Sequence, residues 1–582
     1  MQRKPLKVLQ AGRWTSEHGQ TIVFVLMALS LFLIAAVGLT VDISNLWFHR
    51  QMAQGAADAA CTAGAMDMYV GAATGTFPAG ANFTQGTAFD CGNTTPNTSP
   101  ATSPTPCWYA STDGYASPST FSGLTPGKAS NNVYGSFPSS VPGVTTPPSS
   151  YSSSPFLRID IVDRVQVFFM ALLTASGTQD VRAFSECGLQ AVKGPLPVAV
   201  LDPNGTTPSL SGPASLSIVG GGSRSLQVNL NYNHAISGLS SVNLCQAGPD
   251  YCGGSLGVWG PDAQDVFFVT ACSSSLCTGT QRTPTWDVPS APTADPFAQL
   301  AAPAVPGTTA GPGPYASTKN GTNGCVSYGT DGYCDEYGPG YYKTGLCVIH
   351  TGTCPSGVTG GKYHAAIFDP GVYYITGGMY VDTNSCVRPS SVLGSGTNAI
   401  GGTMFYFSDA NSINFNSSGS FCPAAYSPAS GTPSEKCSGT SVLPTNIPST
   451  ISGSVLLGPC TGTYGDPLGT SDPNGEQRGI LFFQNRSQNA TTNPSFLGGG
   501  QVLAAGIMYF HQCVLGGSDT GVGCASGAYN DTLSLGNGTA GAATYVLGGI
   551  VADHISLTTG SSTTVNLSSS PAYNLLKTSV LR

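Results

Sequence analysis

QTIVFVLMALSLFLIAAVGLTVDISNLWFHRQMAQGAADAACTAGA, residues 20–65, is the stretch that decides how this chain is organised. Its first half, Thr21 to Val41, contains no charged residue and is almost entirely apolar. A helix of this length, rising about 1.5 Å per residue, extends about 31 Å, the thickness of a bilayer's hydrocarbon core. The sequence therefore predicts a transmembrane helix over residues 21–41.

The same helix is predicted to continue beyond the membrane, because no proline interrupts residues 42–68. Small residues recur there at helical spacings, which places them on one narrow face: Ala53, Ala56, Ala57, Ala60, Ala63 and Gly64. Such a face lets a sheet or another helix approach closely. We expect Ile43, Leu46 and Trp47 to begin the same side just outside the membrane.

Several of these features coincide in one known family. Gly19 and Gln20 precede the apolar run, Val41 and Asp42 end it, and QGAADAACTAGA follows at 54–65. Residues 18–70 resemble the N-terminal segment of the TadE/TadG-like proteins of Flp (tight adherence) pilus assembly. The resemblance implies a membrane-anchored structural protein whose partners are the membrane and other pilus-assembly or envelope proteins.

Processing of this segment leaves alternatives. Pilin-like substrates of prepilin peptidase carry Gly before the cut and Glu five residues after it, whereas Phe24 follows Gly19 at that distance. We therefore expect an uncut anchor. Small residues at 35, 36 and 38 imitate a signal-peptidase site, and a cut there would produce a secreted adhesin. The uninterrupted helical pattern favours the anchor.

Charge predicts the orientation and excludes one class of partner. Of the 582 residues only 9% are charged and the net charge is −8, so no basic face for nucleic acid is expected. The first 13 residues carry four cations, Arg3, Lys4, Lys7 and Arg13. The positive-inside rule then places residues 1–20 in the cytoplasm as a basic tail. We expect a single-pass protein of a bacterial inner membrane, with the bulk of the chain periplasmic or extracellular.

The cysteines agree with export. All 18 lie after the apolar run, and an even number in an exported chain predicts disulfides. We expect local pairing in six couples: Cys91 with Cys107, Cys245 with Cys252, Cys272 with Cys277, Cys325 with Cys334, Cys347 with Cys354, and Cys513 with Cys524. A bridge between Cys61 and Cys187, from the helix to a later strand, is a further hypothesis. No couple has zinc-ribbon spacing, so neither a metal site nor a cofactor is expected.

Residues 42–195 are predicted to form a small exported α/β unit. Leu157, Ile159 and Ile161 alternate with charged residues in a half-buried strand, 165–174 is a short apolar helix, and 179–191 is a second alternating strand. This order resembles the continuation of TadG-like proteins and implies a pilin-like unit. Residues 92–155 are rich in Ser, Thr and Pro, which predicts a long exposed loop.

Residues 196–582 are predicted to be mainly β. The 76 glycines of the chain help to separate short alternating or apolar runs such as SINFN, TMFYF, GILFF and GIMYF. The runs recur at roughly 20 residues, the scale of one solenoid turn. We therefore favour a right-handed parallel β-helix with a Cys-rich insertion at 245–355. A β-sandwich is the alternative.

Few residues suggest chemistry. Asp331, Asp335 and Glu336 form the densest acidic group, which is either a calcium site or, as we favour, a solvated turn. Asp369 and Asp553 are expected to be isolated turn or cap groups. Asp202, Asn204 and Thr206 resemble the metal motif of von Willebrand A-type domains, but the turn Asp-Pro-Asn-Gly explains them better.

These observations favour a structural protein that is not an enzyme and has no catalytic residues. The alternative from another class is a carbohydrate-binding or carbohydrate-active β-helix protein that shares the anchor. Exposed aromatics in VYYITGGMYV would then contact surface glycans.

Overall fold

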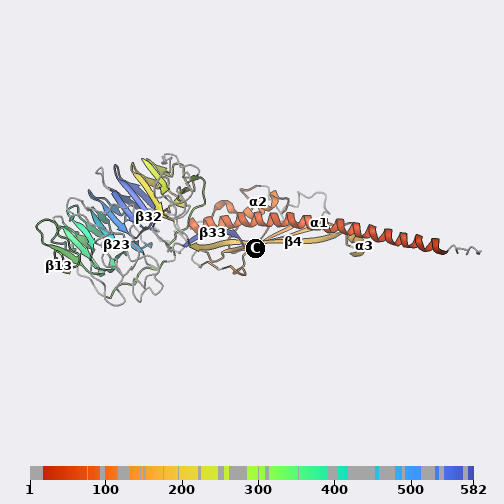
Figure 1. Cartoon of the computed structure of the whole chain (residues 1–582), viewed down its shortest axis with the longest axis horizontal. Helices are drawn as coiled ribbons and strands as arrows, with labels where there is room; N and C mark the ends of the chain where they lie inside the picture. Colours follow the sequence, from red (N-terminus) through yellow and green to blue (C-terminus); the bar gives the residue numbers. More distant parts are fainter. Residues whose placement is uncertain are drawn as a thin grey trace, which may run out of the picture.

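The computed structural model has an elongated shape, with one long helix at one end, stacked sheets at the other and an antiparallel sheet between them (Figure 1). It describes residues 17–74, 77–91, 99–115, 131–144, 146–147, 152–174, 176–193, 196–220, 224–246, 254–260, 285–298, 300–307, 313–350, 353–390, 403–416, 422, 453–457, 479–487, 492–512, 531–536, 543–567 and 574–581. All structural statements below concern these residues.

Helix α1 (Glu17–Thr74) forms the axis of the N-terminal part. Its 58 residues extend about 87 Å, much longer than a bilayer core. Side chains from Ile22 to Val37 are exposed around the helix, as is Val41, and Figure 1 shows this half projecting away from the rest of the chain. Among the described residues, α1 is the one helix long and apolar enough to span a membrane, by length and composition.

The second half of α1 lies on an antiparallel sheet. The sheet has the order β1-β2-β3-β4-β33. Its strands are β1 (Phe89–Asp90), β2 (Asn131–Ser136), β3 (Phe156–Gln166), β4 (Thr178–Lys193) and β33 (Asn574–Val580). The C-terminal strand β33 therefore returns to the N-terminal unit and pairs with β4, from Asn574 opposite Lys193 to Val580 opposite Cys187.

The small-residue face of α1 makes this packing possible. Ala53, Ala57 and Ala60 are buried against β3 and β4, as the spacing predicts. Gly64 is also tightly enclosed, because an added Cβ would lie 2.4 Å from Leu157 Cδ2 and 2.8 Å from Pro106 Cγ. Any larger residue at this position would have to displace Leu157 on β3 and Pro106 on α2.

The prediction that Ile43 and Trp47 begin the packed side is wrong. Both side chains are exposed, and the residues that face the β3–β4 hairpin are Asp42, Asn45 and His49. The packed side continues at helical spacing but changes from small to polar residues. Hydrogen bonds to the hairpin replace apolar contacts near the end of the apolar run.

Two further expectations in this unit differ from the structure. The predicted loop 92–155 contains helix α2 (Thr105–Thr112) and strand β2, and α2 packs on α1 through buried Pro106, Cys107 and Ala110. Its Ser/Thr/Pro-rich composition concealed a short apolar segment that disulfide Cys91–Cys107 holds in place. The predicted helix 165–174 is reduced to α3 (Met170–Thr174), since β3 continues through Gln166.

The remainder is largely parallel sheet, as predicted. We call residues 196–567 the parallel-sheet domain. One of its sheets has ten strands: β12 (Thr285–Asp287), β11 (Ser255–Val258), β8 (Arg224–Val228), β5 (Val198–Val200), β30 (Ile550–Ala552), β27 (Ile507–Phe510), β24 (Ile480–Gln484), β21 (Thr403–Phe407), β18 (Gly371–Ile375) and β15 (Gly340–Tyr342).

A second sheet has eight strands. They are β16 (Leu346–Val348), β19 (Met379–Val381), β22 (Ile413–Phe415), β25 (Ser495–Phe496), β28 (Thr532–Leu535), β31 (His554–Leu557), β6 (Leu210–Ser211) and β9 (Ile236–Ser237).

A third group of strands forms two sheets. Six strands form one of them: β10 (Ser241–Gln246), β7 (Ser215–Gly220), β32 (Ser562–Leu567), β29 (Ala543–Leu547), β26 (Val502–Ala505) and β23 (Ser454–Leu457). Four form the other: β13 (Ala316–Lys319), β14 (Tyr333–Tyr337), β17 (Ala365–Phe368) and β20 (Cys386–Pro389). They adjoin where the Val387 N–H donates to Ser454 Oγ at 3.2 Å.

Each strand from β14 to β29 pairs in parallel with the strand three places later wherever a pairing is described, so the chain visits the sheets in rotation. In the ten-stranded sheet this aligns Tyr373 with Phe405, Phe405 with Phe482 and Phe482 with Met508. The aligned side chains point into one interior and are fully buried. Strands β14, β15 and β16 are part of this winding, so residues 333–348 are not in an insertion as predicted.

The stack of strands is continuous in space, but neighbouring strands in its middle are far apart in the sequence. Strands β30, β31 and β32 pair with β5, β6 and β7, which precede them by about 350 residues. The chain therefore enters the stack in its middle, winds outward to β12, and starts again at the opposite end with β13 and β14. From there it winds back to β32, beside its point of entry.

The described residues between β12 and β13 form a crossing segment (289–298, 300–307 and 313–315), part of which lies along the outer face of the ten-stranded sheet. Its Asp295 Oδ2 accepts a 2.6 Å hydrogen bond from Tyr509, and Phe297 packs edge-on against the same ring. Farther along, Arg486 donates to the Leu300 carbonyl at 3.0 Å. Because the segment covers this face, aromatics such as Tyr406 and Tyr509 are buried on the outside of the sheet as well.

Gly64→Ala is expected to lower the unfolding free energy of the full-length protein in detergent by about 1–3 kcal/mol, since the new methyl overlaps Leu157 and Pro106. Gly55→Ala is the matched control on the same helix, because nothing lies within 4 Å of an added Cβ there. Denaturant unfolding compares the two. Equal effects of the two substitutions would contradict the close packing.

Candidate functional site

The candidate site is the row of contacts that fastens α1 to the β3–β4 hairpin. We call it the helix–hairpin clamp and define it as Asp42, Asn45, His49, Gln54 and Cys61 with the groups they contact. These five residues follow one side of α1 over about five helical turns. Their partners lie along β3, β4 and the turn between them.

The end of the clamp nearest the apolar run is a buried carboxylate. Asp42 is 0% exposed, and its two oxygens accept the backbone N–H groups of Phe168 at 3.0 Å, Phe169 at 2.7 Å and Met170 at 2.5 Å. These donors come from the hairpin turn and the start of α3, where N–H groups lack partners within the helix. A single charged side chain thus holds the turn against α1.

The middle of the clamp is polar. Asn45 Nδ2 donates to the Gln166 carbonyl at 3.3 Å. His49 Nδ1 lies 2.8 Å from Asp163 Oδ2, to which Tyr115 also donates at 3.3 Å. Burial raises the pKa of Asp163, and the hydrogen bond and charge of His49 oppose that shift. Burial and the nearby Asp163 raise the pKa of Tyr115, so its hydroxyl remains a donor.

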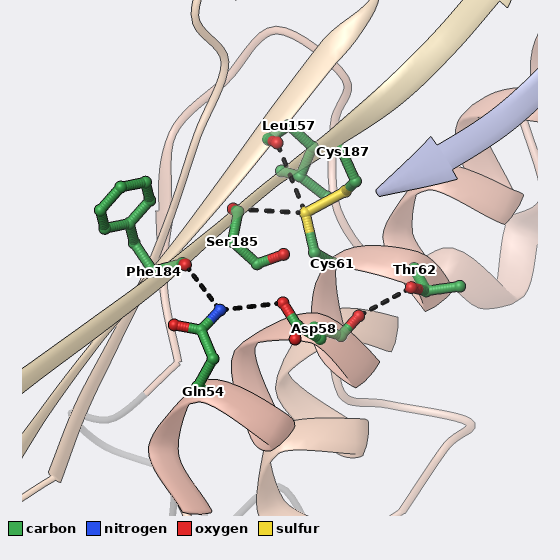
Figure 2. Close-up of a disulfide and its surroundings, with 8 residues drawn as sticks. All are labelled: Gln54, Asp58, Cys61, Thr62, Leu157, Phe184, Ser185 and Cys187. Carbon is green, nitrogen blue, oxygen red and sulfur yellow. Dashed lines mark hydrogen bonds between the residues drawn. A yellow bond between two sulfur atoms is a disulfide. The ribbon is translucent and has the colours of Figure 1, made fainter. Parts of the chain in front are cut away.

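The far end is covalent, as Figure 2 shows. Cys61 on α1 and Cys187 on β4 form a disulfide with Cα atoms 5.9 Å apart, closing a sequence separation of 126 residues. The Cys61 sulfur lies 3.4 Å from the carbonyl oxygens of Leu157 and Ser185. Two turns earlier on the helix, Gln54 Nε2 donates to the Phe184 carbonyl at 2.9 Å and to Asp58 Oδ1 at 3.0 Å.

Three of the other predicted cysteine couples are joined in the structure, and one bridge was not predicted. The joined couples are Cys91–Cys107, Cys325–Cys334 and Cys347–Cys354. The additional bridge, Cys386–Cys422, has a sequence separation of 36 residues. This bridge was not predicted because pairing was expected between cysteines that lie close together in the sequence.

The last three predicted couples fall on residues whose side chains the structure does not describe. They are Cys245 with Cys252, Cys272 with Cys277, and Cys513 with Cys524. All six side chains, those of Cys252, Cys277 and Cys524 included, lie outside the residues whose side chains are described. These three pairings therefore stay predictions.

The acidic group that the sequence placed in a solvated turn is largely buried. Asp335 and Glu336 belong to β14, and Asp335 Oδ2 accepts the backbone N–H groups of Lys362 and Tyr363. Asp331 Oδ2 lies 2.9 Å from His364 Nδ1. The parallel stack explains the difference, since β14 pairs with β17 and has no water-facing turn at these positions.

The remaining acids are also engaged within the fold. Asp553 is not isolated, because its carboxylate lies 2.6 Å from His511 Nδ1 and both groups are buried. Asp202 Oδ1 accepts the Asn204 N–H at 2.9 Å, the turn that the sequence favoured. Among the described residues, no group of three or more His, Cys, Asp or Glu is placed to hold a metal ion.

The face of the antiparallel sheet opposite α1 carries a hollow of about 730 Å³. Arg158, Asp160, Arg182 and Phe184 line it, and the Arg158 guanidinium lies 4.2 Å from the centre of the Phe184 ring. These residues were not predicted to form a site. Their alternation with buried residues such as Ile159 is the signal that places them on the outer face.

Comparison with known proteins finds a match to one family model. Residues 19–67 match the Tad family model, described as "Putative Flp pilus-assembly TadE/G-like". The match agrees with the resemblance read from residues 18–70, and it includes the apolar run and the clamp residues on α1. No curated protein and no solved structure matches this chain. The matched segment is therefore the part of the molecule that carries a functional assignment.

Replacing both clamp cysteines, Cys61→Ser with Cys187→Ser, is expected to lower the unfolding free energy by about 4–5 kcal/mol, from the loop-closure entropy of so long a separation. The control pair is Cys347→Ser with Cys354→Ser, whose 7-residue separation predicts about 2–3 kcal/mol. Urea unfolding of the full-length protein, followed separately for each region, measures both. A larger loss from the control pair would contradict the role assigned to the clamp.

Proposed function

We propose that this chain, whose first helix carries the TadE/G-like Flp pilus-assembly segment, is a membrane-anchored structural protein of pilus assembly. The observation that carries the proposal is the continuity of α1. One helix contains the matched residues 19–67, leaves the apolar run bare and is then clamped to a folded unit by Asp42 and Cys61. Such a helix fixes where the domain beyond it lies relative to the membrane.

The proposed location is a bacterial inner membrane, with the N-terminus in the cytoplasm. The cations of the first 13 residues support this orientation through the positive-inside rule. The disulfides support export of the remainder, since such bonds persist in the periplasm and at the cell surface. The parallel-sheet domain would then stand in the periplasm or beyond it.

The proposed fold of the parallel-sheet domain is a right-handed parallel β-helix. Rotation of the chain through the sheets supports it, as does the general right-handedness of parallel crossovers. The N-terminal unit, a long helix lying on an antiparallel sheet, is proposed to be pilin-like. Its α1 would then assemble beside similar helices.

A structural role requires no catalysis. What supports it is that Asp335 and Asp553 accept hydrogen bonds from within the fold and are buried away from solvent. Pilus components and other envelope proteins are the proposed partners. Their contact surface would be the exposed side of α1 beyond the membrane, which includes Trp47 and Met52.

A photocrosslinking amino acid in place of Met52 is expected to capture identified pilus-assembly proteins in cells that build Flp pili. The matched control replaces Tyr232 on the parallel-sheet domain, because the two side chains are similarly exposed, 44% and 40%. Mass spectrometry identifies the adducts. Cells from which the gene is deleted are also expected to lack normal pili, counted by electron microscopy.

Normal piliation in the deletion strain, together with no pilus-protein adduct at position 52, would overturn the proposed function. Adducts at position 232 with equal yield would remove the role given to α1.

A further inference from the structure

The turn between β3 and β4 exposes apolar side chains that the described chain leaves uncovered. Phe168 is 63% exposed and Leu172 is 84% exposed, and Phe169 beside them is 40% exposed. We call Phe168, Phe169 and Leu172 the hairpin tip. Hydrophobic side chains gathered at a turn and turned outward indicate a contact surface.

The position of the hairpin tip along the axis of α1 is fixed. Asp42 binds the N–H groups of residues 168–170, so the tip cannot move along the helix without breaking a charge-assisted contact. The Phe169 ring also lies against Gly38, where an added Cβ would be 2.3 Å from Phe169 Cδ1. Gly38 is inside the predicted span, about 4–5 Å before its end at Val41.

Polarity changes at the same level on both elements. On α1 the apolar run ends at Val41, and Asp42 and Asn45 follow. On the hairpin the apolar tip gives way to Gln166, whose carbonyl accepts from Asn45, and then to the Arg164–Asp180 ion pair. This alignment is expected where two elements meet one boundary between lipid and water.

We propose that the hairpin tip inserts into the outer leaflet of the membrane that α1 crosses, with lipid acyl chains as its partner. The inference rests on the anchor in the proposed function and adds a second membrane contact to it. Continuity favours lipid over a protein partner, since the tip adjoins the exposed apolar surface of α1 at Gly38. Trp47 and Phe48, exposed slightly farther out, are the aromatic residues expected at an interface.

The second contact has a defined effect. A lone helix is free to tilt and rotate in a bilayer, and its orientation is set by flanking anchors and neighbours. The hairpin tip lies to one side of α1, beside the label α3 in Figure 1. Lipid contact on that side fixes the rotation of α1 about its own axis, and therefore the direction in which the antiparallel sheet faces.

The test uses the full-length protein in vesicles of phosphatidylethanolamine and phosphatidylglycerol, with a photocrosslinking amino acid in place of Leu172. Lipid adducts are expected at roughly five times the yield found when the probe replaces Tyr232, an exposed residue of the parallel-sheet domain. A probe in place of Phe32, inside the span, reports the anchor itself. Adding Asp42→Asn is expected to lower the yield at position 172 severalfold and to leave position 32 unchanged.

The outcomes test the hairpin contact and the membrane anchor separately. Lipid adducts at position 32 but not at position 172 would overturn the hairpin contact and leave the anchor intact. No adduct at either position would overturn both the anchor and the hairpin contact. In cells, a protein adduct at position 172 in place of lipid would show that the tip docks on a protein, which also overturns the proposal.

Discussion

Everything beyond the apolar run depends on how closely α1 approaches the β3–β4 hairpin. A helix and a sheet in contact usually interlock large side chains, but here Ala53, Ala57 and Gly64 bring the two backbones together. The close approach lets Cys61 reach Cys187, and the polar residues nearer the apolar run reach the hairpin turn. The second half of the helix thus becomes part of the folded unit, although its first half remains largely exposed.

The long apolar helix and the strands were predictable because their signals are local. An uncharged apolar run, small residues at helical spacing and alternating strands each depend on neighbours in the sequence. The same holds for disulfides such as Cys347–Cys354, which lie close in the chain. The bridge between Cys61 and Cys187 is predictable because it joins two elements already expected to pack.

What the sequence concealed depends on distant partners. Nothing local shows that Asp42 and Asn45 will face the hairpin while Trp47 stays exposed, because the choice requires knowing that a turn whose N–H groups donate to Asp42 lies opposite. Burial of Asp335 similarly depends on the neighbouring β17 and on the loop at Lys362. The pairing of β30 with β5 spans most of the domain and leaves no periodic trace.

The chain enters the stacked sheets and leaves them at neighbouring positions in the middle of the stack. This arrangement determines which contacts bear a mechanical force applied to the parallel-sheet domain. The polypeptide reaches the stacked sheets from β4 and leaves them to β33, and the two strands are hydrogen-bonded neighbours with Asn574 opposite Lys193. Tension on the stack therefore acts on both strands and loads the hydrogen bonds between them in shear. Many of these hydrogen bonds must then break together. At Cys187, opposite Val580, the disulfide to Cys61 gives this force a covalent cross-link into α1, beside the noncovalent contacts of the clamp. Neither outer end of the stack is a chain terminus, so traction cannot unravel it from a free tip.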